Sequence, residues 1–264
     1  QHTTRYKLKD NLEIRILEDI LSPAPGGLFV AFIHGKRYNG QELYEIDPHG
    51  GRDQVEFMTY DENKFGEWAS FPMSGERKAG TIGHPIRIDH QQLDTTLEKN
   101  ANLIGKARTE FTAQLEGLRV VPFNLFRTLR VRSVKSSDGL PLSFIQEDKN
   151  DDADFAVILP QSLAAGEHFT VITEYEGKEA VTNEGGGNYY PVARMNWYPN
   201  NPGGSLGEYS TYDMTFRIPK GMQIAATGVR VSESNENGQN VSVWKSESPQ
   251  TVAGFSFGRF KKEQ

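Results

Sequence analysis

Hydrophobic and polar residues alternate with a period of two over most of the chain after residue 86. Successive side chains of a strand point to opposite faces of a sheet, so this alternation predicts half-buried strands. The clearest alternating runs are 129–133, 140–144, 155–159, 169–175, 212–218, 229–231, 241–243 and 255–257. Asp138-Gly139 and Asn237-Gly238 are strong hairpin signals between such runs. The pattern predicts an all-β fold, a sandwich or a curved open sheet, for residues 86–264.

Residues 1–85 carry a weaker pattern, which we interpret as a small β-rich unit. Residues 12–17 alternate as a strand would, and the continuous apolar run 28–34 is short enough to be a buried strand. Further strands are expected at 41–46, 54–60 and 67–71, with a short helix opening at 53–57 as an alternative.

The polar run Ser74 to Gly80, followed by Gly83 and Pro85, is typical of a linker or a long surface loop. We therefore place a domain boundary there, which gives a unit at 1–85 and a β domain at 86–264.

The composition narrows the classes of function. A share of 36% hydrophobic and 24% charged residues is that of a globular protein with a real core. The net charge of -6 argues against nucleic acid as a partner, and no apolar run reaches the length of a membrane span. The absence of cysteine excludes disulfides and cysteine nucleophiles. The chain opens at Gln1 instead of methionine, so we expect a trimmed, exported bacterial protein, with a cytoplasmic one as the alternative.

No motif for catalysis or for a metal is present. The six histidines stand at positions 2, 34, 49, 84, 90 and 168. No two of them are four residues apart, so a His-Glu-x-x-His zinc site cannot form. His84 and His90 lie near Asp89 and Asp94, but we interpret these as polar residues of loops and strand ends. The chain also lacks a Gly-x-Ser-x-Gly elbow and a P-loop, so we expect no catalytic residue and no metal here.

An acidic run places Asp148, Asn150 and Asp152 at the first, third and fifth positions of a calcium loop. The register then fails, with Ala153 where glycine is needed and Leu159 where the bidentate glutamate belongs. A solvated hairpin tip is the interpretation we favour, and a weak calcium site stays open.

The segment 185–201 differs from the rest, because it combines three glycines with three tyrosines, a tryptophan and two prolines. Such a composition does not make a helix or a regular strand, so the segment is either a binding face or a structural plug. Trp197 follows Arg194, whose guanidinium could stack on its ring, and we favour the plug. Trp68 and Trp244 lie in strand-like runs and are expected to be core or half-buried residues.

Several landmarks then occur in a characteristic order. They are Asp89-His-Gln-Gln-Leu-Asp-Thr-Thr-Leu97, Gly105-Lys-Ala-Arg-Thr-Glu-Phe111, Leu159-Pro-Gln-Ser-Leu-Ala-Ala-Gly-Glu167, Tyr175-Glu-Gly177, Ala193-Arg194, Trp197-Tyr-Pro199, Tyr212-Asp-Met-Thr-Phe-Arg-Ile-Pro219, Ala226-Thr-Gly228 and Val252-Ala-Gly-Phe-Ser-Phe-Gly258. From His84 to Gln264 the chain resembles the N-terminal, saddle-shaped β domain of M1-family zinc aminopeptidases, typified by aminopeptidase N. Residues 1–85 resemble, more loosely, the extra segment before this domain in some large bacterial M1-like proteins.

The resemblance implies a non-catalytic piece of a longer metallopeptidase, because the family keeps its zinc ligands and catalytic glutamate in the domain that follows. The implied partners are therefore a C-terminal metallopeptidase domain of the same polypeptide, which would hold the zinc, and a peptide substrate. The family's β domain also lends the active site a glutamine or glutamate just upstream of the Ala-Arg pair. The corresponding places here hold Gly187 and Tyr189.

This departure puts ordinary aminopeptidase specificity in question, although Glu184 or Asn188 could substitute for the missing residue. The tentative substrate-binding set is thus Glu184, Gly187, Asn188, Tyr189 and Tyr190, with Arg194, Trp197 and Tyr198 as a structural clasp. Two other functions stay open. One is a free-standing glycan- or peptide-binding module that uses Tyr189, Tyr190, Trp197 and Tyr198, and the other is an interaction or scaffold domain whose sheet edges pair with a partner.

Overall fold

The computed structural model describes residues 12–34, 41–48, 54–61, 64–72, 84–147, 154–193, 195–201 and 208–260. The chain divides into two compact units. Leu12–His84 belongs to one of them and Pro85–Gln264 to the other. We call them the first and the second unit, and each is described by itself. No described helix is long and apolar enough to cross a membrane.

The first unit consists of one helix and one antiparallel sheet. Its elements are α1 (Leu12–Leu21), β1 (Phe29–His34), β2 (Gln41–Ile46), β3 (Val55–Asp61) and β4 (Lys64–Phe71). The strands pair in sequence order, β1-β2-β3-β4. The strands expected at 41–46, 54–60 and 67–71 are therefore present, and the alternative of a helix at 53–57 is wrong.

The strand expected at residues 12–17 is wrong, because this stretch is part of α1. Six residues of alternation are too few to tell a strand from a helix, and the longer pattern Leu12, Ile16, Leu17, Ile20 and Leu21 has helical spacing. The helix ends where the Asp19 carboxylate accepts hydrogen bonds from the backbone N–H groups of residues 26, 27 and 28, at 2.9, 2.9 and 3.2 Å. That contact folds the proline- and glycine-rich turn back against the helix.

Two expectations of burial in the first unit are also wrong. β1 is an edge strand whose apolar side chains are largely solvent-exposed, so the run 28–34 is a strand but not a buried one. Trp68 lies in β4, and 66% of its surface is exposed. Its indole N–H donates a hydrogen bond to Thr59 Oγ1 at 2.8 Å.

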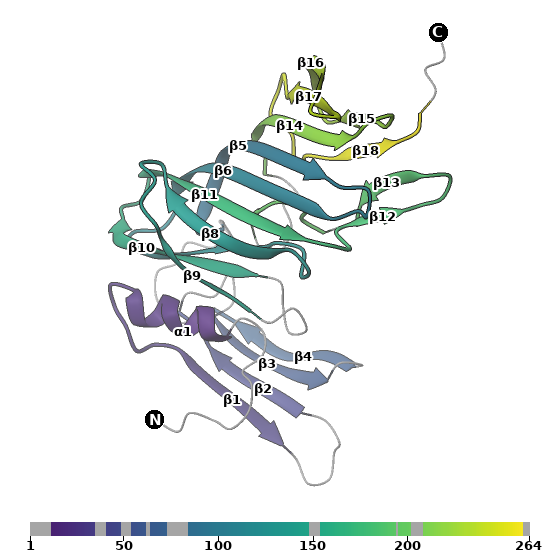
Figure 1. The fold of residues 1–264 in the computed structure, drawn as a ribbon. Coiled ribbons are helices and arrows are strands. Elements are labelled where there is room, and N and C mark those ends of the chain that lie inside the picture. Colours follow the sequence, from purple (N-terminus) through teal and green to yellow (C-terminus); the bar gives the residue numbers. More distant parts are fainter. Residues whose placement is uncertain are drawn as a thin grey trace. The chain divides into compact units, whose positions relative to one another are not determined.

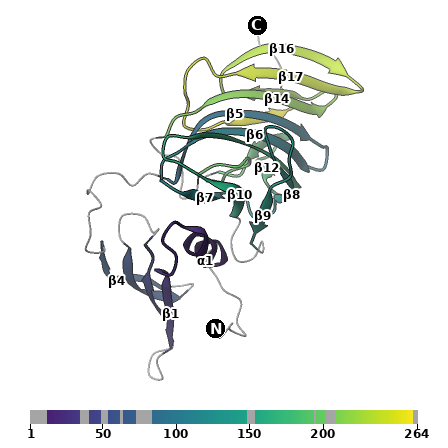
Figure 2. The ribbon, with the colours of Figure 1, turned by 90° about the vertical axis from the view of Figure 1, so that its left-hand side faces the viewer.

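The second unit is all-β, as expected. Its strands are β5 (Ile86–Leu97), β6 (Leu103–Ala113), β7 (Leu118–Phe123), β8 (Arg130–Ser136), β9 (Ser143–Gln146), β10 (Phe155–Leu163), β11 (His168–Gly177), β12 (Val181–Asn183), β13 (Asn188–Pro191), β14 (Thr211–Pro219), β15 (Gln223–Ala226), β16 (Val229–Glu236), β17 (Gln239–Lys245) and β18 (Phe255–Gly258). They form a seven-stranded sheet β16-β17-β14-β5-β6-β11-β8, a three-stranded sheet β7-β10-β9 and a four-stranded sheet β12-β13-β18-β15. Figures 1 and 2 show the seven-stranded sheet as a curved layer with the smaller sheets on one side of it.

Both hairpin signals mark real turns in the second unit. Asn237 and Gly238 have positive φ values of 49° and 78° and join β16 to β17, which is the two-residue turn that matches the twist of the strands. Gly139 has φ 84° and turns the chain after β8. The strand that follows this turn, β9, pairs with β10.

The core of the second unit lies between its sheets. Along β5, every second side chain in the latter part of the strand points into the core. Leu93 and Leu97, for example, are 1% and 0% exposed. Ring contacts join the layers: Phe111 of β6 meets Phe123 of β7 at 6.3 Å, and Phe216 of β14 meets Phe255 of β18 at 5.2 Å between centroids. Trp244 is buried, as expected.

Gly105 makes room for a buried tyrosine. A Cβ atom at this position would lie 2.3 Å from the ring of Tyr175 on the neighbouring strand. We expect Gly105→Ala to lower the free energy of unfolding of the second unit by about 2 kcal/mol, because overpacking forces the ring out of its place. Gly254→Ala is the matched control, since its Cβ would meet only Thr227 Oγ1 at 3.7 Å. Equal melting temperatures of the two variants would contradict the prediction.

The first unit should lose stability as the pH rises. Burial, reinforced by the Asp47 carboxylate and opposed by Arg15, raises the pKa of Glu18 from 4.5 to about 7. Between these pH values the folded unit binds more protons than the unfolded chain, so its free energy of unfolding falls through that window. We expect a loss of about 2 kcal/mol from pH 5 to pH 8, allowing for partial exposure, measured by hydrogen exchange of the α1 amides. Glu18→Gln should abolish the loss and exposed Glu13→Gln should retain it; the reverse would refute the assignment.

Candidate functional site

A glycine turn forms the tip of the β12–β13 hairpin. Val181 pairs with Pro191 and Asn183 with Tyr189, and residues 184–187 connect the two strands. Gly185, Gly186 and Gly187 have φ values of 104°, 63° and 80°, a left-handed run that residues with a Cβ adopt only with strain. A Cβ on any of the three would meet nothing within 4 Å, so the tip projects into open space.

One side of the hairpin is fixed by β18. Asn188 pairs with Gly258, and a Cβ at Gly258 would lie only 2.7 Å from Gly187 O and 2.8 Å from Asn188 Oδ1. The ring of Tyr189 stacks on Phe257, with centroids 4.7 Å apart and planes 18° apart. The close backbone approach therefore requires glycine at position 258, and it positions Asn188 and Tyr189.

The remaining candidate side chains point the other way or into solvent. Tyr190 follows Tyr189 in β13, so the two rings lie on opposite faces, and Tyr190 is 42% exposed. Glu184 is exposed, and its carboxylate accepts a hydrogen bond from Thr182 Oγ1 at 2.8 Å. The five predicted substrate-binding residues thus share one hairpin, but only Tyr190 and Glu184 present side chains that are free to reach a ligand.

Trp197 is a buried anchor. Only 2% of its surface is exposed, and its indole N–H donates to Ala253 O at 2.7 Å. Its ring makes edge contacts with Tyr198 and Phe255, both at 5.0 Å between centroids. The ring therefore packs inside the second unit and does not reach solvent.

Tyr198 continues the anchor. Its hydroxyl accepts a hydrogen bond from the backbone N–H of Ala253 at 3.1 Å and lies 3.3 Å from the hydroxyl of Tyr212. Burial raises the pKa of both tyrosines, because the phenolate form would lose its hydration. Both hydroxyls thus stay protonated and serve as fixed hydrogen-bonding groups.

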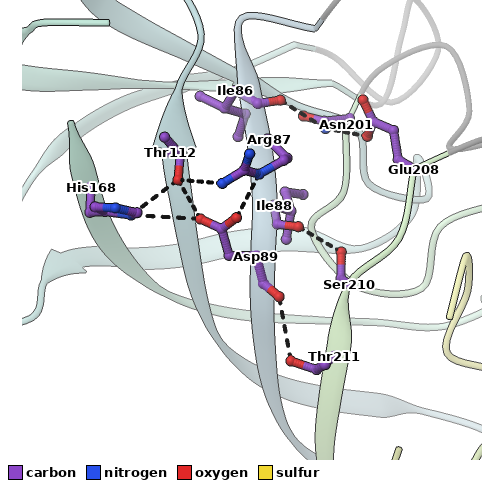
Figure 3. A network of polar contacts seen from close by, with 10 residues as sticks. All are labelled: Ile86, Arg87, Ile88, Asp89, Thr112, His168, Asn201, Glu208, Ser210 and Thr211. Carbon is purple, nitrogen blue, oxygen red and sulfur yellow. Dashed lines mark hydrogen bonds and ion pairs between the residues drawn. The ribbon is translucent and has the colours of Figure 1, made fainter. Parts of the chain in front are cut away.

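Polar side chains of β5 and β6 hold the end of the same segment. Gln91 donates its amide to Pro199 O at 2.8 Å, and its Oε1 accepts from Thr109 Oγ1 at 2.8 Å. Figure 3 shows the neighbouring attachments, in which Asn201 Nδ2 donates to Ile86 O at 3.2 Å and Ser210 Oγ to Ile88 O at 2.9 Å. The chain on both sides of residues 202–207 is therefore tied to the start of β5.

The predicted clasp is described in part. Arg194 lies outside the described residues, so its stacking on Trp197 stays a prediction. Trp197 and Tyr198 are buried, which removes two of the four rings that a glycan-binding face would have used. Sequence reasoning missed Gly258 and Ala253, whose roles follow from contacts with residues more than 50 positions away. The small residues in Val252-Ala-Gly-Phe-Ser-Phe-Gly258 were the available signal.

The residues weighed as metal ligands make separate local contacts. Asp89 accepts hydrogen bonds from Arg87 Nε at 2.8 Å and from Thr112 Oγ1 at 2.6 Å (Figure 3), and Asp94 pairs with Arg217. His90 Nδ1 lies 2.8 Å from Thr211 Oγ1. Across the described ranges, no group of three or more His, Cys, Asp or Glu residues could hold a metal ion. Asp148, Asn150 and Asp152 lie outside those ranges, so the weak calcium site stays untested.

Comparison with known proteins identifies the fold. A scan against protein-family models and a search of curated protein sequences found no match. Among solved structures, the M1 zinc metallopeptidase of Deinococcus radiodurans is similar at 19% identity and a TM-score of 0.58, over 66% of this chain and 42% of that chain. Yeast LTA4 hydrolase is similar at 16% identity and a TM-score of 0.55, over 68% of this chain and 30% of that chain. This protein thus shares the fold of a part of M1 zinc metallopeptidases and spans less than half of their length.

The fluorescence of the three tryptophans tests whether Trp197 is buried. Trp68 is exposed, whereas Trp197 and Trp244 are buried. We expect iodide to quench part of the emission of the wild-type chain and almost none of the emission of Trp68→Phe. Oligosaccharides should not shift the emission of this variant, because neither remaining ring reaches solvent. Strong iodide quenching of Trp68→Phe would show that Trp197 or Trp244 is accessible after all.

Proposed function

We propose that the second unit is a non-catalytic β domain of an M1-type zinc metallopeptidase, which packs against a separate catalytic domain and lines part of its peptide cleft. The supporting observation is the structural similarity, which covers 66% of this chain but only 42% of the Deinococcus enzyme. A β domain without a catalytic machinery of its own fits this partial overlap. The zinc would be held by the catalytic domain.

The hairpin tip is the part of this domain that we assign to the cleft. The base of the segment is immobilised by Trp197 and Tyr198, while the glycine turn stands free of any contact for a Cβ. A fixed base with an exposed tip positions backbone N–H groups and a few side chains against a ligand at a low entropic cost.

Within the tip, Glu184 is the group that we assign to the substrate's N-terminal amine. Its carboxylate is exposed and accepts a hydrogen bond from Thr182, which holds it at a defined place. A carboxylate and an ammonium group attract each other more strongly where a second domain excludes water. Tyr190 would supply apolar contact to the first side chains of the peptide.

The gene sequence beyond the codon for Gln264 tests the assignment most directly. We expect the reading frame to continue into a domain with a His-Glu-x-x-His motif and a downstream glutamate, the ligand set of this class of zinc site. A frame that continues without this motif would exclude the peptidase assignment.

Kinetics of the full-length enzyme test the role of Glu184. We expect Glu184→Gln to raise KM for peptides with a free N-terminus about tenfold with little change in kcat, because a charge contact to the bound ground state is lost. N-acetylated peptides should bind the variant and the wild type equally.

Glu247→Gln is the matched control, since Glu247 is an exposed glutamate outside the hairpin and should leave KM unchanged. The same loss in both variants, or an equal loss with N-acetylated peptides, would refute the role of Glu184 while leaving the domain assignment intact.

A further inference from the structure

The helix-covered face of the first unit's sheet holds charged residues beside the buried Leu43. α1 covers one face (Figure 1), and on this covered face Arg15 of the helix binds the carboxylates of Glu45 and Asp47. A helix packed on a sheet usually covers the more apolar face. Here the charged residues lie beneath the helix, and the opposite face is left without a covering element within the described part of this unit.

That uncovered face carries a continuous row of aromatic rings across all four strands. Phe29 contacts Tyr44 at 6.1 Å, Tyr44 contacts Phe57 at 6.4 Å, and Phe57 contacts Trp68 at 6.4 Å between centroids. We call these four residues the aromatic row. Ile33 lies on the same face because it follows Phe29 by four residues in β1. Phe71 lies there because it pairs with Val55, which precedes Phe57 by two residues in β3.

The face is exposed to an extent that single surface residues do not reach. The exposed fractions are 51% for Phe29, 44% for Ile33, 66% for Trp68 and 50% for Phe71. A half-exposed aromatic side chain leaves roughly 100 Å² in water, so the face presents on the order of 500 Å² of contiguous apolar surface. A patch of this size is among the largest that soluble monomers expose, and such patches often serve as interaction sites.

The charges of the chain and of the aromatic face limit which kind of protein can bind this face. The chain has a net charge of -6, so two copies repel each other over most of their surface. The described side chains of the aromatic face are uncharged apart from Glu42, which the register places beside Ile33 at its end. A neutral, flat sheet face is complementary to itself and lacks the charge pattern that would select a different, oppositely charged protein.

We propose that the aromatic face is a self-association surface, on which two copies of this chain pack sheet against sheet around a two-fold axis. The arrangement is isologous, because each aromatic row contacts the same row of the other copy. With its rim, the face approaches the roughly 800 Å² per partner that stable interfaces bury. Two twisted sheets packed at about -30° would interdigitate such rings.

Sedimentation velocity of the full 264-residue chain between about 1 and 200 µM tests the proposal. We expect a monomer–dimer equilibrium with a dissociation constant of about 1–100 µM, as suits an interface of this size. Trp68 should become protected from iodide over the same concentration range. A chain that stays monomeric up to 200 µM would overturn the proposal and leave the face to a different partner.

Phe71→Lys locates the interface, because an ammonium group buried between two apolar sheets should weaken the dimer by about 100-fold or more. Val231→Lys is the matched control, since Val231 is a comparably exposed valine of β16 in the second unit. Ile33→Lys repeats the test from the other edge of the sheet, should Phe71→Lys fail to fold by circular dichroism. A dimer that Phe71→Lys and Ile33→Lys leave intact, or that Val231→Lys dissociates, would place the interface elsewhere and refute the proposal.

Discussion

The burial of Trp197 is the interaction on which the second unit depends. The chain passes from β13 in the four-stranded sheet to β14, which lies parallel to β5 in the seven-stranded sheet. Trp197 lies in the connection between β13 and β14. Because the indole packs on Phe255 of β18 and on Phe216 of β14, it joins the four-stranded sheet to the seven-stranded sheet.

The buried segment around Trp197 also helps to explain how the glycine-rich tip of the β12–β13 hairpin keeps a defined conformation. Glycine loses more conformational freedom on folding than any other residue, so three in a row would form a poorly defined loop on their own. Here the hairpin is held on one side by Phe257 and Gly258 and at its base by the buried segment. The contacts with β18 therefore restrict the glycine turn and place its exposed groups relative to the sheet.

Most long strands of the second unit could be predicted because one side of each packs against a large core, as the alternating burial along β5 shows, whereas β16 is exposed along its length. The sequence indicated that the aromatic residues beside Pro199 would be buried, but it did not indicate their partners. Ala253, which accepts the hydrogen bond of Trp197, lies 56 positions away, and nothing in the sequence around it predicts this contact. The first unit was harder, because its helix is short and its apolar residues are not sorted by burial. Trp68 lies at a register shift between β3 and β4, and nothing local shows that its face has no cover within the described part of the unit.

The two units therefore differ in how the alternation of apolar and polar residues relates to burial. In the second unit the side chains that point toward the core are mostly apolar and buried, as the hydrophobic–polar alternation predicts. In the first unit the face opposite α1 carries several exposed aromatic residues, while an ion-paired arginine lies beneath the helix. Burying charges under a helix offers little stability, so apolar solvent-facing residues on the other side are explained best by a partner. The departure from the usual in–out pattern is itself the signal of an interface.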